Sequence, residues 1–152
     1  MKTLLIITHA PSKNTQKLAD AACGSAQHSD IDIKVVCKRP QDTQPADILQ
    51  ADGVLLGTTE NLGYMAGLTK DFFDRCYYPV LEHKQGMPFA LYIRAGFDGT
   101  GTLRAIQTIT TGLRWQWINE ALILKGEWQE GFCEQVEELA MTFAAGLEAG
   151  IY

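Results

Sequence analysis

Short apolar runs alternate along the chain with segments whose apolar residues recur every three or four positions. The first run, at residues 4–7, contains no charge and no polar alternation, which is typical of a strand buried on both faces of a parallel sheet. After a polar loop at 8–15, Leu18 and Ala22 lie one helical turn apart among good helix formers. The same alternation of strand and helix continues to the end of the chain, without repeats or linkers.

This pattern predicts five strands and five helices in strict alternation. Parallel strands joined by right-handed crossovers leave few arrangements at this size. We therefore expect an α/β fold, a single domain over residues 1–152, built as a three-layer α/β/α sandwich around a five-stranded parallel sheet of order 2-1-3-4-5. The strands are expected at 4–7, 31–37, 53–57, 87–93 and 121–124. The helices are expected directly after the loop at 8–15, at 45–50, at 66–77 with Leu68 facing inward and Pro79 just beyond, from a cap at Thr100 or Thr102 to Leu113, and from Phe132 to Leu147.

In such a sheet the loops after the first, third and fourth strands gather at the carboxyl edge, where ligands bind. The first of these loops precedes a helix whose unpaired N–H groups and dipole favour an anion, and we predict that it holds a phosphate. The alternative is that Asn14 and Thr15 are ordinary N-cap residues in a loop that needs no ligand. The chain contains neither a P-loop motif nor the glycine fingerprint of dinucleotide-binding proteins.

Composition and charge limit the kinds of partner that the protein can bind. The 152 residues are 46% apolar and 20% charged, which is ordinary for a globular protein, and the net charge of −5 argues against nucleic acid and anionic membranes. No apolar run is long enough to cross a membrane and no signal peptide is recognisable, so we expect a cytoplasmic protein. The four cysteines and three histidines are dispersed, which predicts no metal site. We expect the cysteines to be small core residues in a reducing compartment.

With the three loops in view, the chain resembles the flavodoxin-like FMN proteins, especially the NAD(P)H-dependent FMN reductases and quinone oxidoreductases. The similarity is clearest over residues 57–75, GTTENLGYMAGLTKDFFDR, although Thr59 stands where the family usually has proline and Glu60-Asn61 replace a tyrosine-containing pair. The first loop is similar to the family's Ser-x-Asn-Thr-x-x-Leu phosphate segment, and GFDGTG is similar to its glycine-rich flavin loop. The charged residues of the Gly-x-x-Lys-x-Phe-x-Asp-Arg pattern are expected to pair within their helix and to place it. The residues that match this pattern are Gly67, Lys70, Phe72, Asp74 and Arg75.

The resemblance implies a flavodoxin-like fold with an FMN site built from all three loops. FMN phosphate would lie on the first loop, the flavin ring against the second, and the pyrimidine side of the ring along the third. His9 would either cap the phosphate or close the strand, and Lys13 would either add charge or be solvated. Gly63 would permit a positive φ beside the flavin, Tyr64 would contact the flavin or a dimer partner, and Asp98 would disfavour a reduced flavin anion. The implied cofactor-binding residues are Thr8, His9, Ser12, Lys13, Asn14, Thr15, Thr58, Thr59, Glu60, Asn61, Leu62, Gly63, Tyr64, Ala95, Gly96, Phe97, Asp98 and Gly99.

Function follows from the implied cofactor. No nucleophile or general base stands out in the sequence, which fits a flavoprotein whose cofactor performs the chemistry. We expect an oxidoreductase that transfers electrons from NADH or NADPH through FMN to a quinone, a flavin or a similar acceptor. The alternatives are an electron-transfer flavodoxin that shuttles between redox protein partners, which would be more acidic, and a cofactor-free flavodoxin-like binding module. A homo-oligomer is expected from a surplus of aromatic residues, namely Tyr64, Tyr77, Tyr78, Trp115 and Trp117.

Overall fold

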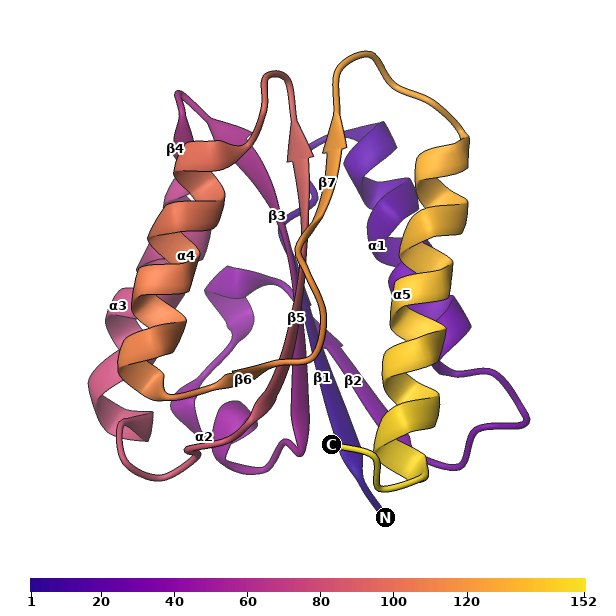
Figure 1. The fold of residues 1–152 in the computed structure, drawn as a ribbon, viewed down its shortest axis with the longest axis vertical. Coiled ribbons are helices and arrows are strands. Elements are labelled where there is room, and N and C mark those ends of the chain that lie inside the picture. The colour runs from indigo at the N-terminus through magenta and orange to yellow at the C-terminus, as the bar shows by residue number, and fades with distance from the viewer.

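A parallel sheet with helices on both faces forms the protein, and the computed structural model describes all of residues 1–152 (Figure 1). Helices α3 and α4 cover one face of the sheet, and α1 and α5 cover the other. The strands are β1 (Thr3–Thr8), β2 (Lys34–Lys38), β3 (Gly53–Asn61), β4 (Tyr64–Met65), β5 (Pro88–Ala95), β6 (Gln116–Trp117) and β7 (Leu122–Lys125). The helices are α1 (Lys13–Ala26), the 3-10 helix η1 (Pro40–Asp42), α2 (Pro45–Leu49), α3 (Gly67–Val80), α4 (Thr100–Leu113) and α5 (Gly131–Glu148).

The strand order is β2-β1-β3-β5, and both β6 and β7 pair with the outer side of β5. These two short segments share the position of the fifth strand, because the chain leaves the sheet briefly between Trp117 and Leu122. All the pairings are parallel except that of β3 with β4. The three-layer sandwich and the predicted order 2-1-3-4-5 are therefore confirmed, with the fifth strand interrupted.

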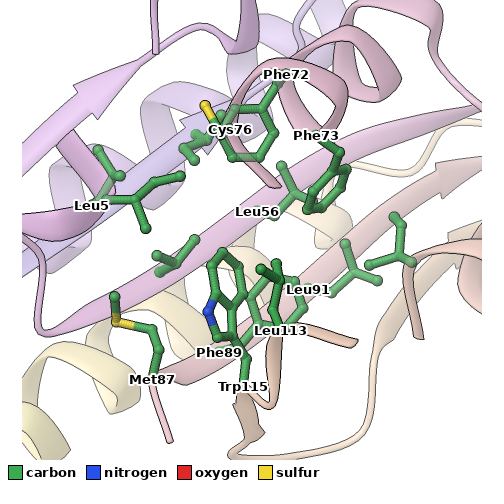
Figure 2. Close-up of a cluster of buried hydrophobic side chains, with 14 of the residues drawn as sticks. Leu5, Leu56, Phe72, Phe73, Cys76, Met87, Phe89, Leu91, Leu113 and Trp115 are labelled. Carbon is green, nitrogen blue, oxygen red and sulfur yellow. The ribbon is translucent and has the colours of Figure 1, made fainter. Parts of the chain in front are cut away.

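Burial on both faces explains why the inner strands are continuous apolar runs. Successive side chains of β1 point to opposite faces, and none of the residues at positions 4–7 is more than 1% exposed. Figure 2 shows Phe72 and Cys76 of α3 gathered against Leu5 and Leu56 of the sheet. The opposite core lies under α1 and α5, and the predicted inner stripe of α5 is buried there: Phe132, Val136, Leu139, Phe143 and Leu147.

The aromatic residues are less available to a partner than the sequence suggested. Trp115 and Trp117 both pack on Phe89, with ring centroids 5.5 and 5.0 Å from it. Tyr78 remains 78% exposed. Trp115 and Trp117 are therefore used inside the fold, whereas Tyr64 and Tyr78 stay exposed. None of the helices is both long and apolar enough to cross a membrane.

Several boundaries differ from the sequence-based prediction: β2 begins at Lys34 rather than at 31, β5 ends at Ala95 rather than at 93, and α1 begins at Lys13 rather than after 15. Two further differences have clear local reasons. The strand predicted to end at Gly57 continues to Asn61, because β3 and β4 form a hairpin closed by Leu62 and Gly63, which have φ of 54° and 76°. Two positive φ values match a type I′ turn. Helix α3 continues through Pro79, since the Leu81 N–H still reaches the Tyr77 carbonyl at 2.9 Å and closes the last turn.

The face of α3 is also rotated from the prediction. Leu68, expected to face inward, is 41% exposed, whereas Thr69 and Phe73 are buried. Thr69 is one residue further along the helix and binds the hydroxyl of Thr58 on β3 at 2.8 Å. A buried polar pair therefore orients the first turn, where the apolar pattern alone predicted a leucine.

The cysteines correct another prediction. Cys23 of α1 and Cys37 of β2 form a disulfide, with their Cα atoms 6.4 Å apart, because the β1-α1-β2 crossover brings the last turns of α1 beside the edge strand. The expectation that the cysteines are reduced core residues is therefore wrong for this pair. It holds for Cys76, which is buried, and burial raises the pKa of its thiol to about 11. Cys133 is free and half-buried.

Counting and removing thiols tests the disulfide. Denatured, unreduced protein should expose two titratable thiols, those of Cys76 and Cys133. Because the bridge joins residues 14 positions apart, Cys37→Ser should lower the free energy of unfolding by about 3 kcal/mol in urea titrations. Cys133→Ser is the control and should change it far less. Four titratable thiols in the unreduced protein would contradict the pairing.

Candidate functional site

A polar pocket lies where the ends of β1, β3 and β5 meet. It has a volume of about 310 Å3, near the lower end of the range for small-molecule sites. The segments that form it are the start of α1, the end of β3 and the end of β5, which are the three loops expected to meet. The residues that line it are Pro11, Ser12, Asn14, Thr15, Thr59, Glu60, Asn61, Arg94 and Gly96.

The first wall of the pocket is the capped N-terminus of α1. Ser12 is the N-cap: its hydroxyl accepts from the Thr15 N–H at 3.2 Å, and the Thr15 hydroxyl accepts from the Ser12 N–H at 2.9 Å. The alternative that Asn14 and Thr15 are N-caps is therefore wrong, because both residues lie in the first turn of the helix. The backbone N–H groups of Lys13 and Asn14 have no hydrogen-bond partner. Those two unpaired donors, more than the hydroxyls, make this wall suitable for an anion.

The second wall is the β3–β4 hairpin. The Thr59 hydroxyl donates to the Asn61 side-chain oxygen at 2.7 Å, which holds Asn61 at the pocket. Leu62 at the tip is fully exposed and has the left-handed φ described above, a conformation that usually favours glycine or asparagine. The predicted positive φ of Gly63 is confirmed. The hairpin thus presents polar atoms to the pocket and an apolar side chain to solvent.

The third wall is joined to the second by a carboxylate. Both oxygens of Glu60 accept backbone N–H groups of the third loop, from Phe97 and from Gly99, each at 2.9 Å. These two N–H groups belong to the loop along which the pyrimidine side of the flavin was expected, and both are already satisfied within the chain. The Asp98 carboxylate accepts the Thr100 N–H at 3.0 Å, and this bond lowers the pKa of Asp98.

The start of α4 also fixes the hairpin. Gly99, and neither of the expected threonines, is the N-cap of α4. The buried Thr102 hydroxyl donates to the Tyr64 carbonyl at 3.0 Å. A Cβ on Gly101 would collide with the Gly63 carbonyl oxygen, so only glycine permits this approach. Gly101 therefore serves the packing of α4 against the hairpin.

Most of the expected site residues lie in these walls. Seven line the pocket itself: Ser12, Asn14, Thr15, Thr59, Glu60, Asn61 and Gly96. Others belong to the same three loops without lining it: Lys13, Leu62, Gly63, Tyr64, Phe97, Asp98 and Gly99.

Four expected residues are not brought to the pocket. Thr8 lines a separate depression beside the disulfide, and the Thr58 hydroxyl is turned toward α3. Ala95 is fully buried in the core under α3 and α4. His9 is half-buried, and its backbone N–H closes the strand by donating to the Gly57 carbonyl at 2.9 Å. Burial lowers the pKa of the His9 side chain, which favours a neutral imidazole at pH 7.

Arg94 was missed by the sequence analysis. It lies one residue before the end of β5 and lines the pocket. Its signal was present in the sequence, because it is the only charged residue between Pro88 and Ala95 in an otherwise apolar strand. A lone charge near the carboxyl end of an inner strand points either to a paired core charge or to a ligand.

The charged residues of the motif in α3 have a structural role. Lys70 pairs with Asp74 and Arg75 with Asp71, as expected for charges one helical turn apart. The Arg75 guanidinium also donates to the carbonyls of Pro40 and Thr43, each at 2.8 Å. This motif therefore fixes α3 against η1 and places no charge in the pocket.

Comparison with known proteins shows the fold. No family model matches the chain, and no curated protein sequence matches it. Among solved structures, an archaeal flavodoxin is similar with a TM-score of 0.78 and 15% identity, covering 93% of this chain and 96% of its own. For flavodoxin 1 from Bacillus cereus the TM-score is 0.75 and the identity is 16%, and the match covers 94% of this chain and 97% of that protein. For a flavodoxin, WrbA-like protein from Agrobacterium tumefaciens the TM-score is 0.72 and the identity is 16%, and the match covers 97% of this chain and 98% of that protein. The fold is therefore flavodoxin-like over nearly its whole length.

Replacing Glu60 tests the link between the second and third walls. Glu60→Ala should remove both acceptors, so the amides of Phe97 and Gly99 should exchange with deuterium about 10- to 100-fold faster, since a bond to a charged group is worth roughly 1.5–3 kcal/mol. Glu60→Gln keeps one acceptor oxygen and should give an intermediate rate. Unchanged exchange in Glu60→Ala would show that the carboxylate does not hold the loop.

Proposed function

We propose that the chain binds FMN in this pocket and serves as a flavin-dependent electron-transfer protein. The observation that carries the proposal is the convergence of Asn14, Asn61 and Gly96, from three separate loops, on one polar pocket at the carboxyl edge of a flavodoxin-like sheet. FMN combines an anionic phosphate with a planar, largely apolar ring. The site likewise combines the start of α1, which suits an anion, with exposed apolar side chains on the second and third loops, which suit a ring. When bound, FMN supplies the redox chemistry, and the protein binds and orients it.

The phosphate end fits the start of α1. The unpaired N–H groups of Lys13 and Asn14 lie at the positive end of the helix dipole, where a phosphate oxygen is the favoured acceptor. The capping box of Ser12 and Thr15 fixes these donors before any ligand arrives. The loop therefore loses little conformational freedom when it binds an anion.

The ring end fits the exposed side chains of the second and third loops. Leu62 and Phe97 are exposed, at 106% and 83%, and Tyr64 is 40% exposed. Exposed apolar and aromatic side chains beside a polar pocket are suited to cover a planar ring. The Glu60 carboxylate would lie near the ring edge, where it can accept a ligand N–H.

As the finer function we propose an oxidoreductase that takes electrons from NADH or NADPH and passes them to a quinone, a flavin or a similar acceptor. A second candidate is an electron shuttle reduced by a separate protein. The whole-length likeness to proteins named flavodoxins favours the shuttle. The modest net charge of −5 favours the enzyme, since shuttles use strongly acidic surfaces to find basic partners.

The donors of α1 can be tested without disturbing the helix. Lys13→Pro removes one unpaired N–H at the first helical position, where proline is tolerated, and Ser12 already has the extended backbone that precedes proline. We expect it to raise the Kd for FMN about tenfold relative to Lys13→Ala, which removes the same side chain but keeps the N–H. Flavin fluorescence titration measures both. Equal affinities would show that the Lys13 N–H does not bind the phosphate.

Steady-state kinetics separates the two candidate functions. The FMN-loaded protein should oxidise NADH or NADPH in the presence of a soluble quinone, at a rate that rises with protein concentration. A matched control is free FMN at the same concentration. Reduction by dithionite but no oxidation of either nicotinamide above the free-FMN rate would favour the shuttle.

A further inference from the structure

The Arg94 guanidinium is held in a fixed position at the pocket. Its Nη1 donates to the Ala95 carbonyl at 2.9 Å and to the Leu124 carbonyl at 3.0 Å. The ring of Phe132 lies 5.1 Å from the guanidinium carbon, and that of Trp128 lies 6.0 Å away. Two carbonyls and two aromatic faces therefore hold the side chain in place, so little side-chain entropy remains to be lost on binding.

The charge of Arg94 has no carboxylate partner. No ion pair in the structure includes it. The carboxylate of Glu60, which shares the pocket, accepts the two N–H groups of the third loop, and that of Glu130 binds Lys17 and the Trp128 indole. The partners of the Arg94 guanidinium are therefore carbonyls and aromatic rings, and no carboxylate lies within ion-pair distance of it.

Three of the five guanidinium N–H groups of Arg94 are also unused, namely the Nε–H and both on Nη2. Arg94 lines the same pocket as Asn14, which comes from a different wall and has an unpaired backbone N–H. Donors on two walls, one of them charged, match a group with several acceptor oxygens and about two negative charges. A phosphate monoester has these properties.

We propose that Arg94 binds the phosphate of the ligand and makes the pocket select a phosphorylated flavin over the same flavin without phosphate. This rests on the proposed FMN function. A purely structural role for Arg94, joining β5 to β7 through Nη1, predicts a different result. A variant would then bind both flavins more weakly than the wild type does, or both as tightly as the wild type does.

The test compares FMN with riboflavin. Arg94→Gln should raise the Kd for FMN about 10- to 100-fold and that for riboflavin less than about threefold, measured by quenching of flavin fluorescence. Added salt should weaken FMN binding more in the wild type than in Arg94→Gln. The matched control is Arg114→Gln, which removes the same charge at the far end of α4 and should leave both affinities unchanged. Equal losses for both flavins, or no loss for FMN, would overturn the proposal.

A second measurement separates this proposal from the FMN function and from misfolding. Inorganic phosphate should raise the thermal midpoint of the cofactor-free wild type and of Arg94→Lys, which keeps the charge, but not of Arg94→Gln. If the wild type binds phosphate but neither flavin, the FMN function fails and the role of Arg94 stands. In another outcome, the wild type binds FMN, but phosphate raises the thermal midpoint of Arg94→Gln by as much as that of the wild type. In that case the role of Arg94 fails and the FMN function stands.

Discussion

Burial of the inner strands on both faces is the constraint on which the site depends. The side chains of β1, β3 and β5 are enclosed between two helical layers, and each buried leucine or isoleucine contributes roughly 1.5–3 kcal/mol. Polar side chains are therefore largely confined to the ends of these strands. Because β1, β3 and β5 are neighbours, their carboxyl ends are adjacent, and Asn14, Asn61 and Gly96 meet although they are far apart in sequence. The pocket is a consequence of the core.

The parts of the fold that follow from periodicity could be predicted from the sequence. The apolar run at 4–7 and the stripe of α5 each specify one burial pattern, and right-handed crossovers then leave few strand orders, of which the observed one is 2-1-3-4-5. The misses have another origin. The Cys23–Cys37 bridge and the Thr58–Thr69 pair depend on which side chains face each other after folding, which spacing does not encode. Arg94 was missed because a charge inside a strand carries no motif.

The site combines two kinds of wall. The second and third loops form one unit, joined by the Glu60 carboxylate, by the Thr102 hydroxyl on the Tyr64 carbonyl, and by the close contact of Gly101 with Gly63. The first loop is fixed separately by its own capping box. The pocket between them has no large apolar side chain in its lining, while Leu62 and Phe97 are exposed at the tips of the second and third loops. Such a gradient of polarity suits a ligand with an anionic end and a planar end.

The central claim is that three loops hold a single flavin nucleotide, and amide chemical-shift mapping tests it most directly. Adding FMN to uniformly 15N-labelled cofactor-free protein should perturb the amides of Asn14, Asn61 and Gly96 together, with one common saturation curve. Amides at the opposite edge of the sheet, such as that of Gly86, should not move. Perturbation of only one loop, three different saturation curves, or no perturbation at saturating FMN would contradict the account.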